Sequence, residues 1–470
     1  MKKILRAIIG AHWIFAFVAL IFGLSLSFIT PPLWGADEAV HFFRAWQISN
    51  GEISQSKVTI NGQSSDAGSV PSSFVRLNAL KNKDNADSVP GTGKQVDSRK
   101  EYFNISKTPV KNDTRAANPF PKTIYSPVVY FAPAMGIYIS HFFNPTAITM
   151  LMSARIATLI LYVLLASLAL YVLRKSAVKW LVFIIALLPM SLYQASVVSP
   201  DSLLLGLSLI LFSILYATMY ENHQINKKEI GLVVLTACLI TLIKAPYLPL
   251  IFLLLLLKLP RSISPRKKLF IKIGIPILCT LVAVASVMSV KGVITSTLPL
   301  PNINIFSQLH GIFTNPFHYL YTLANSIVVL DWVPQIIGLF GASFIYMPGI
   351  VIQILLVSLF MTTFVDTKEN TSDIDEADIH SAMIYIGFSL IAALAIITTL
   401  YLTWTPVSAK LVQGIQGRYF LPIIVFFLFG LRKLTGSRLL ISKRSALLGY
   451  PMLMTLSLLI SLAWYYRILH

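Results

Sequence analysis

Two adjacent acids, Asp37 and Glu38, open a long polar segment that follows the first apolar stretch of the chain. Charged side chains are costly to hold beside a bilayer, so they are candidates for function. A helix beginning at Ala36 would place Asp37 and His41 on one face, with Arg44 near it. A carboxylate there could deprotonate an acceptor hydroxyl, or bind Mg²⁺ or Mn²⁺ that neutralises a leaving phosphate. The structural alternative is a helix N-terminus that favours acids, with His41 and Arg44 as interfacial anchors.

Two further ionisable residues stand at the ends of apolar segments. Asp201 follows Ser199-Pro200, where it could share a metal ion with Asp37 or position a sugar hydroxyl, although Ser-Pro-Asp is also an ordinary helix start. Lys244 separates two short apolar segments and needs an anionic partner at that depth. A lipid-linked phosphate would supply that partner, and so would a nearby acid.

Arg418 and Tyr419 lie where the chain enters a late apolar segment, in the sequence QGRYFLP. The planar donor fork of arginine suits phosphate, but arginine and tyrosine are also ordinary interfacial anchors. Arg155, near one end of its apolar segment, is a weaker phosphate-binding candidate of the same kind. Tyr247, in the sequence KAPY that begins at Lys244, completes the predicted substrate-binding residues.

The composition is typical of a membrane protein. Of 470 residues, 56% are hydrophobic and 12% are charged, and the mean hydropathy is +0.72. Because a bilayer offers no hydrogen-bond partners, the backbone must satisfy its own polar groups. The predicted fold class is therefore all-α, a single polytopic transmembrane helical bundle over residues 1–470. The net charge of +19 is spread over short loops, which indicates membrane orientation and contact with anionic lipid rather than nucleic-acid binding.

Apolar stretches predict about eleven membrane spans. They cover residues 7–29, 147–173, 180–199, 201–219, 230–243, 246–258, 269–290, 336–363, 381–403, 419–433 and 445–466. The first is too long for the apolar region of a signal peptide, so we expect an uncleaved anchor. Basic clusters at 2–6, 174–179, 258–268 and 432–444 predict a cytoplasmic N-terminus. By this count the acidic segment 366–378 lies inside, whereas Asp37, Asp201, Lys244 and Arg418 share the outer side.

The polar segments form outer loops in this topology. Residues 30–124 are the first outer loop, and its polar part, 50–124, could stay partly disordered until a substrate or partner binds. Residues 125–143, rich in aromatics and proline, are expected to lie as a helix in the outer interface. Residues 291–335 form the second outer loop. The short segments on either side of Lys244 are tolerated at membrane depth where they line a wet cavity.

In chain order, these features resemble the GT-C superfamily of integral-membrane glycosyltransferases. The matching stretches are Asp37-Glu38 with His41, Tyr125-Ser126-Pro127, Ser199-Pro200-Asp201, Lys244-Ala245-Pro246-Tyr247 and Gln416-Gly417-Arg418-Tyr419-Phe420-Leu421-Pro422. The chain also looks like a bacterial polytopic membrane family of unknown function that is found in envelope polysaccharide contexts. Tyr-Ser-Pro stands here where a double proline is commoner in similar proteins.

The resemblance implies transfer of a sugar from a polyprenyl-phosphate donor to an envelope glycan, such as lipopolysaccharide or O-antigen. The reaction would take place on the outer face of the bacterial cytoplasmic (inner) membrane. Asp37 would be the base of an inverting transfer, assisted by Glu38 or a metal, while Lys244 and Arg418 would stabilise the departing lipid phosphate. An upstream polyprenyl-phosphate glycosyltransferase and a flippase would supply the donor.

Three other functions remain open at this point. A lipid-linked-sugar flippase or transporter would distribute its charged residues through the membrane midplane and show repeated halves. A non-catalytic assembly subunit would use the first outer loop to recruit an enzyme. A glycan polymerase or ligase would move whole glycan blocks with the same residues as a single-sugar transferase.

Overall fold

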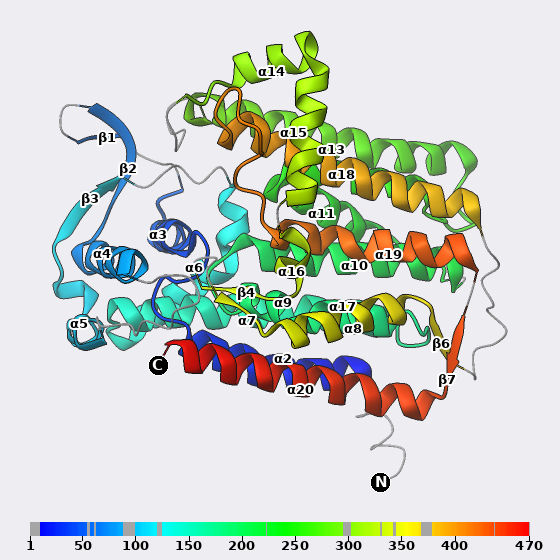
Figure 1. Ribbon diagram of the computed structural model, residues 1–470, viewed down its shortest axis with the longest axis horizontal. Coiled ribbons are helices and arrows are strands. Elements are labelled where there is room, and N and C mark those ends of the chain that lie inside the picture. Colours follow the sequence, from blue (N-terminus) through cyan, green and yellow to red (C-terminus); the bar gives the residue numbers. More distant parts are fainter. Residues whose placement is uncertain are drawn as a thin grey trace.

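A computed structural model describes residues 10–53, 57–60, 63–87, 99–119, 125–221, 223–294, 302–329, 331–341, 345–367, 378–436 and 438–469. The described chain is mostly helical, as predicted, and its longest helices lie side by side (Figure 1). Six of these helices are long and apolar enough to cross a membrane. They are α2 (Ala11–Ile29), α7 (Ala147–Val172), α10 (Pro200–Tyr220), α13 (Pro265–Ile294, with the apolar part ending at Met288), α18 (Ile379–Trp404) and α20 (Lys443–Leu469).

The prediction of about eleven spans is not confirmed, because several predicted spans are shorter or broken. The segment 180–199 forms two helices, α8 (Lys179–Leu187) and α9 (Pro189–Ala195), since a proline in a helix interior removes a hydrogen bond. The predicted spans 230–243 and 419–433 are the single helices α11 (Lys227–Ile243) and α19 (Leu421–Thr435).

Two other predicted spans contain several short elements each. Residues 246–258 become η4 (Ala245–Tyr247), α12 (Leu248–Ile251) and η5 (Phe252–Leu256). Residues 336–363 include the end of α16 (Trp332–Ile337), the antiparallel strands β4 (Leu339–Phe340) and β5 (Ile345–Tyr346), and α17 (Gly349–Thr363). These short helices and strands let the chain change direction, which one continuous transmembrane helix would not allow.

Helix α10 lies at the centre of the bundle. Its apolar window is 89% buried, more than that of any other candidate span among the described residues. Helices α7, α11 and α19 all pack against it, and Phe212 on α10 lies 5.5 Å from the rings of both Phe426 and Phe429 on α19. A helix that is apolar all round is a helix buried on all sides. Its N-terminal residue Asp201 is therefore held in a fixed place.

The described parts of the first outer loop form helices and strands. The expected partial disorder within 50–124 stays a prediction, because 54–56, 61–62, 88–98 and 120–124 lie outside the described residues. The loop contains α3 (Glu38–Ser49), α4 (Ser72–Asp87), α5 (Arg99–Ile105), η1 (Val110–Asn112) and an antiparallel sheet of β1 (Lys57–Ile60), β2 (Gln63–Pro71) and β3 (Arg115–Pro119). Phe74 on α4 packs 4.7 Å from Phe42 and 5.7 Å from Trp46 on α3, measured between ring centroids. This aromatic cluster attaches the sheet and α4 to the bundle.

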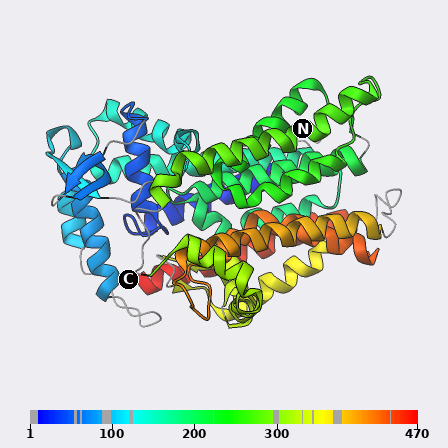
Figure 2. The same ribbon diagram turned by 90° about the horizontal axis from the view of Figure 1, so that it is seen from above.

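The other two non-spanning segments are helical. Residues 127–143 form η2 (Pro127–Tyr130), α6 (Phe131–Ser140) and η3 (His141–Phe143), and Gly136 packs directly on the backbone of Ser153 in α7. A helix at 125–143 was predicted. The second outer loop contains α14 (Ile305–Thr314) and α15 (Pro316–Val329) and leads into α16. Figure 2 shows the helical layers from a second direction.

The basic segments gather at one end of the bundle. Lys258 Nζ donates to the Met219 carbonyl at the end of α10, and Arg432 pairs with Asp366 at 3.1 Å. Beside that pair, β6 (Val365–Thr367) and β7 (Leu439–Ile441) run parallel. Asp366 thus lies with the basic residues, where the span count placed it, and 368–377 lie outside the described residues. Since Asp201 lies in the first turn of α10 and Met219 in its last, Asp201 lies at the opposite end.

We expect the two ends to face opposite sides of the membrane, because basic loops stay in the cytoplasm. In a C238S/C279S background, a membrane-impermeant maleimide applied to intact cells should label Glu101→Cys on α5. Lys267→Cys on α13 should be labelled only after permeabilisation. Both positions are exposed. Equal labelling of the two variants in intact cells would contradict this topology.

Candidate functional site

Four charged side chains from distant parts of the chain form one network, which we call the charged network. Arg418 Nη2 donates to Asp37 Oδ2 at 3.0 Å, and Arg418 Nε lies 3.3 Å from Asp201 Oδ2. Lys244 Nζ donates to Asp201 Oδ1 at 2.6 Å. Acids and bases therefore alternate in the order Asp37, Arg418, Asp201, Lys244, and their formal charges cancel. As predicted, these four residues come together at the end of the bundle opposite the basic loops.

Local sequence explains why Asp201 and Lys244 stand at helix ends. Pro200 starts α10, and the Ser199 hydroxyl accepts a hydrogen bond from the Asp201 backbone N–H at 3.2 Å. Lys244 ends α11 with an extended backbone, and Pro246 then prevents the helix from continuing. The carboxylate and the ammonium group meet because α11 packs along α10.

Arg418 is positioned by a close approach of two short helices. It lies in η7 (Gly417–Phe420), where the Gly417 N–H donates to Gln335 Oε1 of α16 at 3.0 Å. A Cβ atom at Gly417 would lie 2.5 Å from the backbone nitrogen of Ile336, so only glycine fits there. The guanidinium is almost fully buried, and its partners hold it in one orientation.

Two tyrosines from the predicted set support the cations. Lys244 Nζ lies 4.3 Å above the centre of the Tyr419 ring, a cation–π distance. The Tyr419 hydroxyl accepts a hydrogen bond from Arg418 at 3.3 Å, and the buried Tyr247 hydroxyl donates to the Tyr419 carbonyl at 2.6 Å. Tyr419 thus lies directly against both cations, whereas Tyr247 holds its backbone in place.

Asp37 is the member of the charged network that solvent reaches. Its side chain is 61% exposed, against 3% for Arg418 and 9% for Asp201. It occupies the N-cap position of α3, where a helix N-terminus favours an acid, and its side chain makes no capping hydrogen bond. Its backbone is left-handed, with φ of 59°, a conformation that aspartate and asparagine tolerate better than most residues. Non-glycine residues in this conformation cluster at functional sites.

Electrostatics keep the Asp37 carboxylate ionised. The surrounding protein alone would raise the pKa of this carboxyl group, but the charge of Arg418, aided by His41 and by the Arg418 hydrogen bond, holds the pKa below its usual value. The Asp37 side chain is at the same time largely exposed to solvent. Asp37 is therefore a proton acceptor that water and a ligand can reach.

His41 is neutral beside this acid. Burial lowers the pKa of the imidazole to about 4, although the nearby Asp37 charge opposes that shift. Its Nδ1 lies 2.9 Å from the hydroxyl of Tyr130, and its ring lies 5.6 Å from that of Tyr125. Tyr125 was noted only as part of the matching stretch Tyr125-Ser126-Pro127, and neither tyrosine was predicted as a site residue. The sequence signal that could have identified them is that both are tyrosines, with a polar hydroxyl group, near Pro127 in an otherwise apolar segment.

Glu38 is fully buried and forms a two-bond ion pair with Arg155. Arg155 Nε and Nη2 donate to the two carboxylate oxygens, each at 2.7 Å, and neither side chain is exposed. The same oxygens accept the backbone N–H groups of Val198 and Gly35, both at 3.0 Å. All four acceptor positions of the carboxylate are occupied. This corrects the prediction that Glu38 assists Asp37 chemically.

Arg155 has no donor left for a substrate. Its remaining N–H groups donate to the carbonyls of Ser27 and Thr30 at 2.8 Å and of Pro31 at 2.9 Å. Ser27 and Thr30 lie at the end of α2, where carbonyls lack helical partners, and Pro31 begins the loop that follows. The prediction that Arg155 binds phosphate is therefore corrected as well. Together Glu38 and Arg155 fix the loop that carries Asp37.

Arg44 also serves the fold. Its guanidinium donates to Gln47 Oε1 and to the Glu52 carbonyl, both at 3.1 Å, and to the Ile53 carbonyl. These contacts tie the segment after α3 to that helix. Among the described residues, none of these Arg44 hydrogen bonds goes to the charged network, so the structure does not support its predicted role in substrate binding.

The donor set does not fit the predicted Mg²⁺ or Mn²⁺ site of Asp37 and Asp201. Both oxygens of Asp201 already face cations, and Arg418 lies between the two acids. Within the described ranges, no three His, Cys, Asp or Glu side chains are grouped to hold a metal ion. A divalent ion between the two acids would be repelled by the positive charges of Arg418 and Lys244. The reaction proposed for this site therefore uses no metal ion.

Removing the charge of Glu38 should destabilise the protein, because Arg155 would stay buried without an acid. We expect Glu38→Gln to lower the free energy of unfolding by about 3–5 kcal/mol. The matched control is Glu52→Gln, which breaks the solvent-exposed contact to Arg115 at 3.4 Å and should cost less than about 1 kcal/mol. Denaturant unfolding in detergent measures both. Equal effects would show that the buried pair does not hold the loop.

Comparison with known proteins places the chain in a family. A family model described as a predicted membrane protein (DUF2142) matches residues 20–427. No curated protein and no solved structure matches the chain. The match runs from α2 into α19 and includes every member of the charged network. The chain therefore belongs to the DUF2142 family of predicted membrane proteins.

Proposed function

We propose that the protein is a membrane glycosyltransferase that moves a sugar from a polyprenyl-phosphate donor to an envelope glycan. The transfer takes place on the outer face of the cytoplasmic membrane. The observation that carries the proposal is the charged network, with an exposed, ionised Asp37 hydrogen-bonded to a buried Arg418. A proton acceptor next to fixed cations suits a reaction in which a hydroxyl group attacks and a phosphate leaves.

Each network residue has a distinct part in this reaction. Asp37 takes the proton from the acceptor hydroxyl as its oxygen bonds to the anomeric carbon. The bond from that carbon to the phosphate oxygen breaks, and the electron pair stays with the polyprenyl phosphate. Attack from the side opposite the phosphate inverts the anomeric configuration. Asp201 does not react, because it is held between Lys244 and Arg418.

The two cations favour the transition state over the bound donor. The phosphate in the donor is a diester with one negative charge, and it gains a second as it leaves. Lys244 and Arg418 interact more strongly with the greater charge, which lowers the barrier rather than only tightening binding. The Tyr419 ring beside Lys244 keeps the ammonium group in place without adding a charge.

The location of the network supports transfer over transport. A flippase needs polar groups along the path that its substrate takes through the membrane. Here Asp37, Asp201, Lys244 and Arg418 are in direct contact at one end of the bundle. Block transfer by a polymerase or ligase would use the same chemistry, with a larger glycan on the donor.

Replacing Asp37 with Asn should abolish most transfer without disturbing the fold. Asparagine tolerates the left-handed backbone of this position, so the change removes the base and little else. We expect the rate to fall by about 10²–10⁴-fold. The assay follows labelled sugar from polyprenyl-phosphate donors to envelope glycan in proteoliposomes.

The control for that assay is Glu101→Gln, an exposed acid on α5 outside the network. It should transfer sugar at the wild-type rate. An unchanged rate in Asp37→Asn would exclude the base role. Movement of labelled lipid across the bilayer without chemical change would favour a flippase instead.

The pH profile should report Asp37 and not His41. Since the pKa of Asp37 is lowered, transfer should fall only on the acidic side, as the carboxylate gains its proton. His41 has a pKa of about 4 and stays neutral above it, so the rate should be flat between about pH 6 and 7. Arg418→Gln should move the acidic limb to higher pH. An inflection near neutral pH that disappears in His41→Asn would contradict this assignment.

A further inference from the structure

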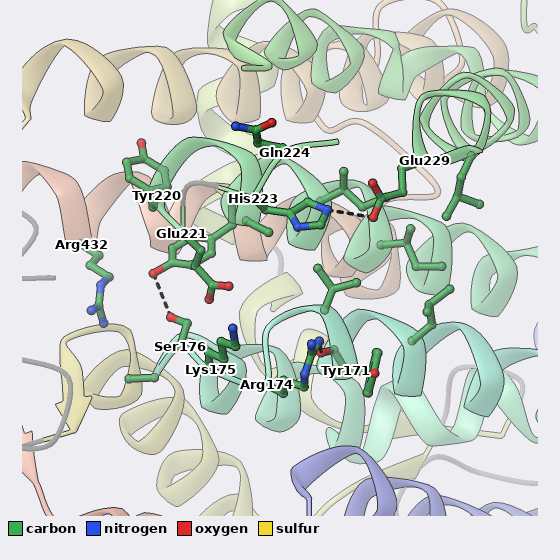
Figure 3. Close-up of a pocket in the computed structure, with 18 of the residues that line it drawn as sticks. Tyr171, Arg174, Lys175, Ser176, Tyr220, Glu221, His223, Gln224, Glu229 and Arg432 are labelled. Carbon is green, nitrogen blue, oxygen red and sulfur yellow. Dashed lines mark hydrogen bonds and ion pairs between the residues drawn. The ribbon is translucent and has the colours of Figure 1, made fainter. Parts of the chain in front are cut away.

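A groove with a mixed apolar and charged lining lies at the end of the bundle opposite the charged network. Helices α7 and α11 each pack against α10 but scarcely against each other, so α10 forms the floor between two walls. The cavity there has a volume of about 690 Å³, within the range of pockets that bind small molecules. Figure 3 shows Tyr171 and Arg174 on one side of it and His223 and Glu229 on the other.

The floor and lower walls of the groove are apolar. Leu168 and Val172 come from α7, Ile210 and Ile214 from α10, and Leu232 from α11. Just outside it, Leu164 on α7 and Leu235 on α11 are exposed on candidate lipid-facing surfaces. The interior of the groove therefore continues into the apolar surface that a bilayer would cover. A hydrocarbon chain could pass from the bilayer into this space without contacting water.

Arg174 supplies positive charge at the polar end of the groove. Its side chain is exposed, donates to the Tyr171 carbonyl at 2.9 Å and lies 4.3 Å from the Tyr171 ring centre. Among the described residues it forms no ion pair. Lys175 follows it in the lining. An arginine with unused donors at the membrane surface suits a phosphate group.

Glu229 and Asp366, two acids that line the groove, are paired with other residues and do not neutralise Arg174. Glu229 accepts the Asn226 N–H at 2.7 Å and contacts His223 at 2.8 Å, so it caps α11. Asp366 pairs with Arg432 at 3.1 Å. Both carboxylates are committed within the protein, and Glu221, the third acid of the lining, also interacts within it. The positive charge offered to an anion at this rim is therefore mainly that of Arg174.

The groove does not continue to the charged network. At that end η2 packs against both α10 and α11, and α6 packs against α7. The space between α7 and α11 is thus filled before it reaches Asp201 and Lys244. A ligand in the groove belongs to the leaflet at the basic end of the protein, and it is separate from the sugar-transfer site.

We propose that this groove binds one anionic glycerophospholipid from the leaflet at the basic end. One acyl chain lies over α10 between α7 and α11, and the phosphate contacts Arg174 and Lys175. Basic residues between membrane helices at this level are a known setting for anionic head groups. The proposal does not depend on the proposed sugar transfer.

Native mass spectrometry of the full-length protein with phosphatidylglycerol or phosphatidylcholine of identical acyl chains tests the head-group preference. The wild type should retain phosphatidylglycerol about tenfold more than phosphatidylcholine. Replacing Arg174 and Lys175 with Gln should reduce the retention of phosphatidylglycerol to the level of phosphatidylcholine. The matched control replaces Arg261 and Lys267, exposed cations of the same end outside the groove, and should behave as wild type. Equal retention of the two lipids by the wild type would overturn the proposal.

A second measurement uses the wild-type protein, so a variant that fails to fold cannot affect it. Phosphatidylglycerol with a photoreactive acyl chain should crosslink to α7, α10 or α11 within 168–232. Crosslinks confined to other helices would overturn the proposal. An excess of soluble glycerol phosphate should leave the crosslinks unchanged, and its ability to abolish them would show that the site takes a free phosphate compound rather than a lipid.

Discussion

The buried ion pair between Glu38 and Arg155 is the interaction on which the site depends. Five donors of Arg155 and four acceptor positions of Glu38 are all used, and together they join the end of α2, the start of α3, α7 and the turn before α10. A pair buried this completely is stable only when every polar atom finds a partner. It fixes Glu38, next to Asp37 in the chain, by its side chain, and Gly35, two residues before Asp37, by its N–H. Asp37 is thereby held in a left-handed backbone with its carboxylate outward.

Adjacent acids thus have opposite roles. Glu38 has lost contact with solvent, whereas Asp37 keeps it and meets Arg418. The remaining members of the charged network neutralise one another, which lets the buried Asp201 and Arg418 and the partly buried Lys244 stay charged at the edge of an apolar bundle. Arg418 connects the two acids, so its position controls both the ionisation of Asp37 and the cationic surface that would meet a phosphate. A close packing of Gly417 on α16 sets that position.

Sequence alone predicted the helical membrane fold and the meeting of Asp37, Asp201, Lys244 and Arg418. Positive charge in the loops gave the direction of each span, and the direction placed these residues at one end. It could not assign Glu38, because its role depends on Arg155, which lies 117 positions away in the chain. Sequence also could not place α4 on the bundle, because Phe74 finds its aromatic partners Phe42 and Trp46 only in three dimensions. The predicted number of about eleven spans is not confirmed, because Pro189 and the η4 to η5 region break apolar runs that hydropathy treats as continuous.

The central claim is that the charged network binds the phosphate of a polyprenyl phosphate. A cryo-electron microscopy map of the protein with that lipid bound tests the claim most directly. We predict phosphate density within hydrogen-bonding distance of Lys244 Nζ and of the Arg418 guanidinium, with the Asp37 carboxylate facing the same space. Phosphate density elsewhere on the protein, with Lys244 and Arg418 still paired only to Asp201 and Asp37, would contradict the account.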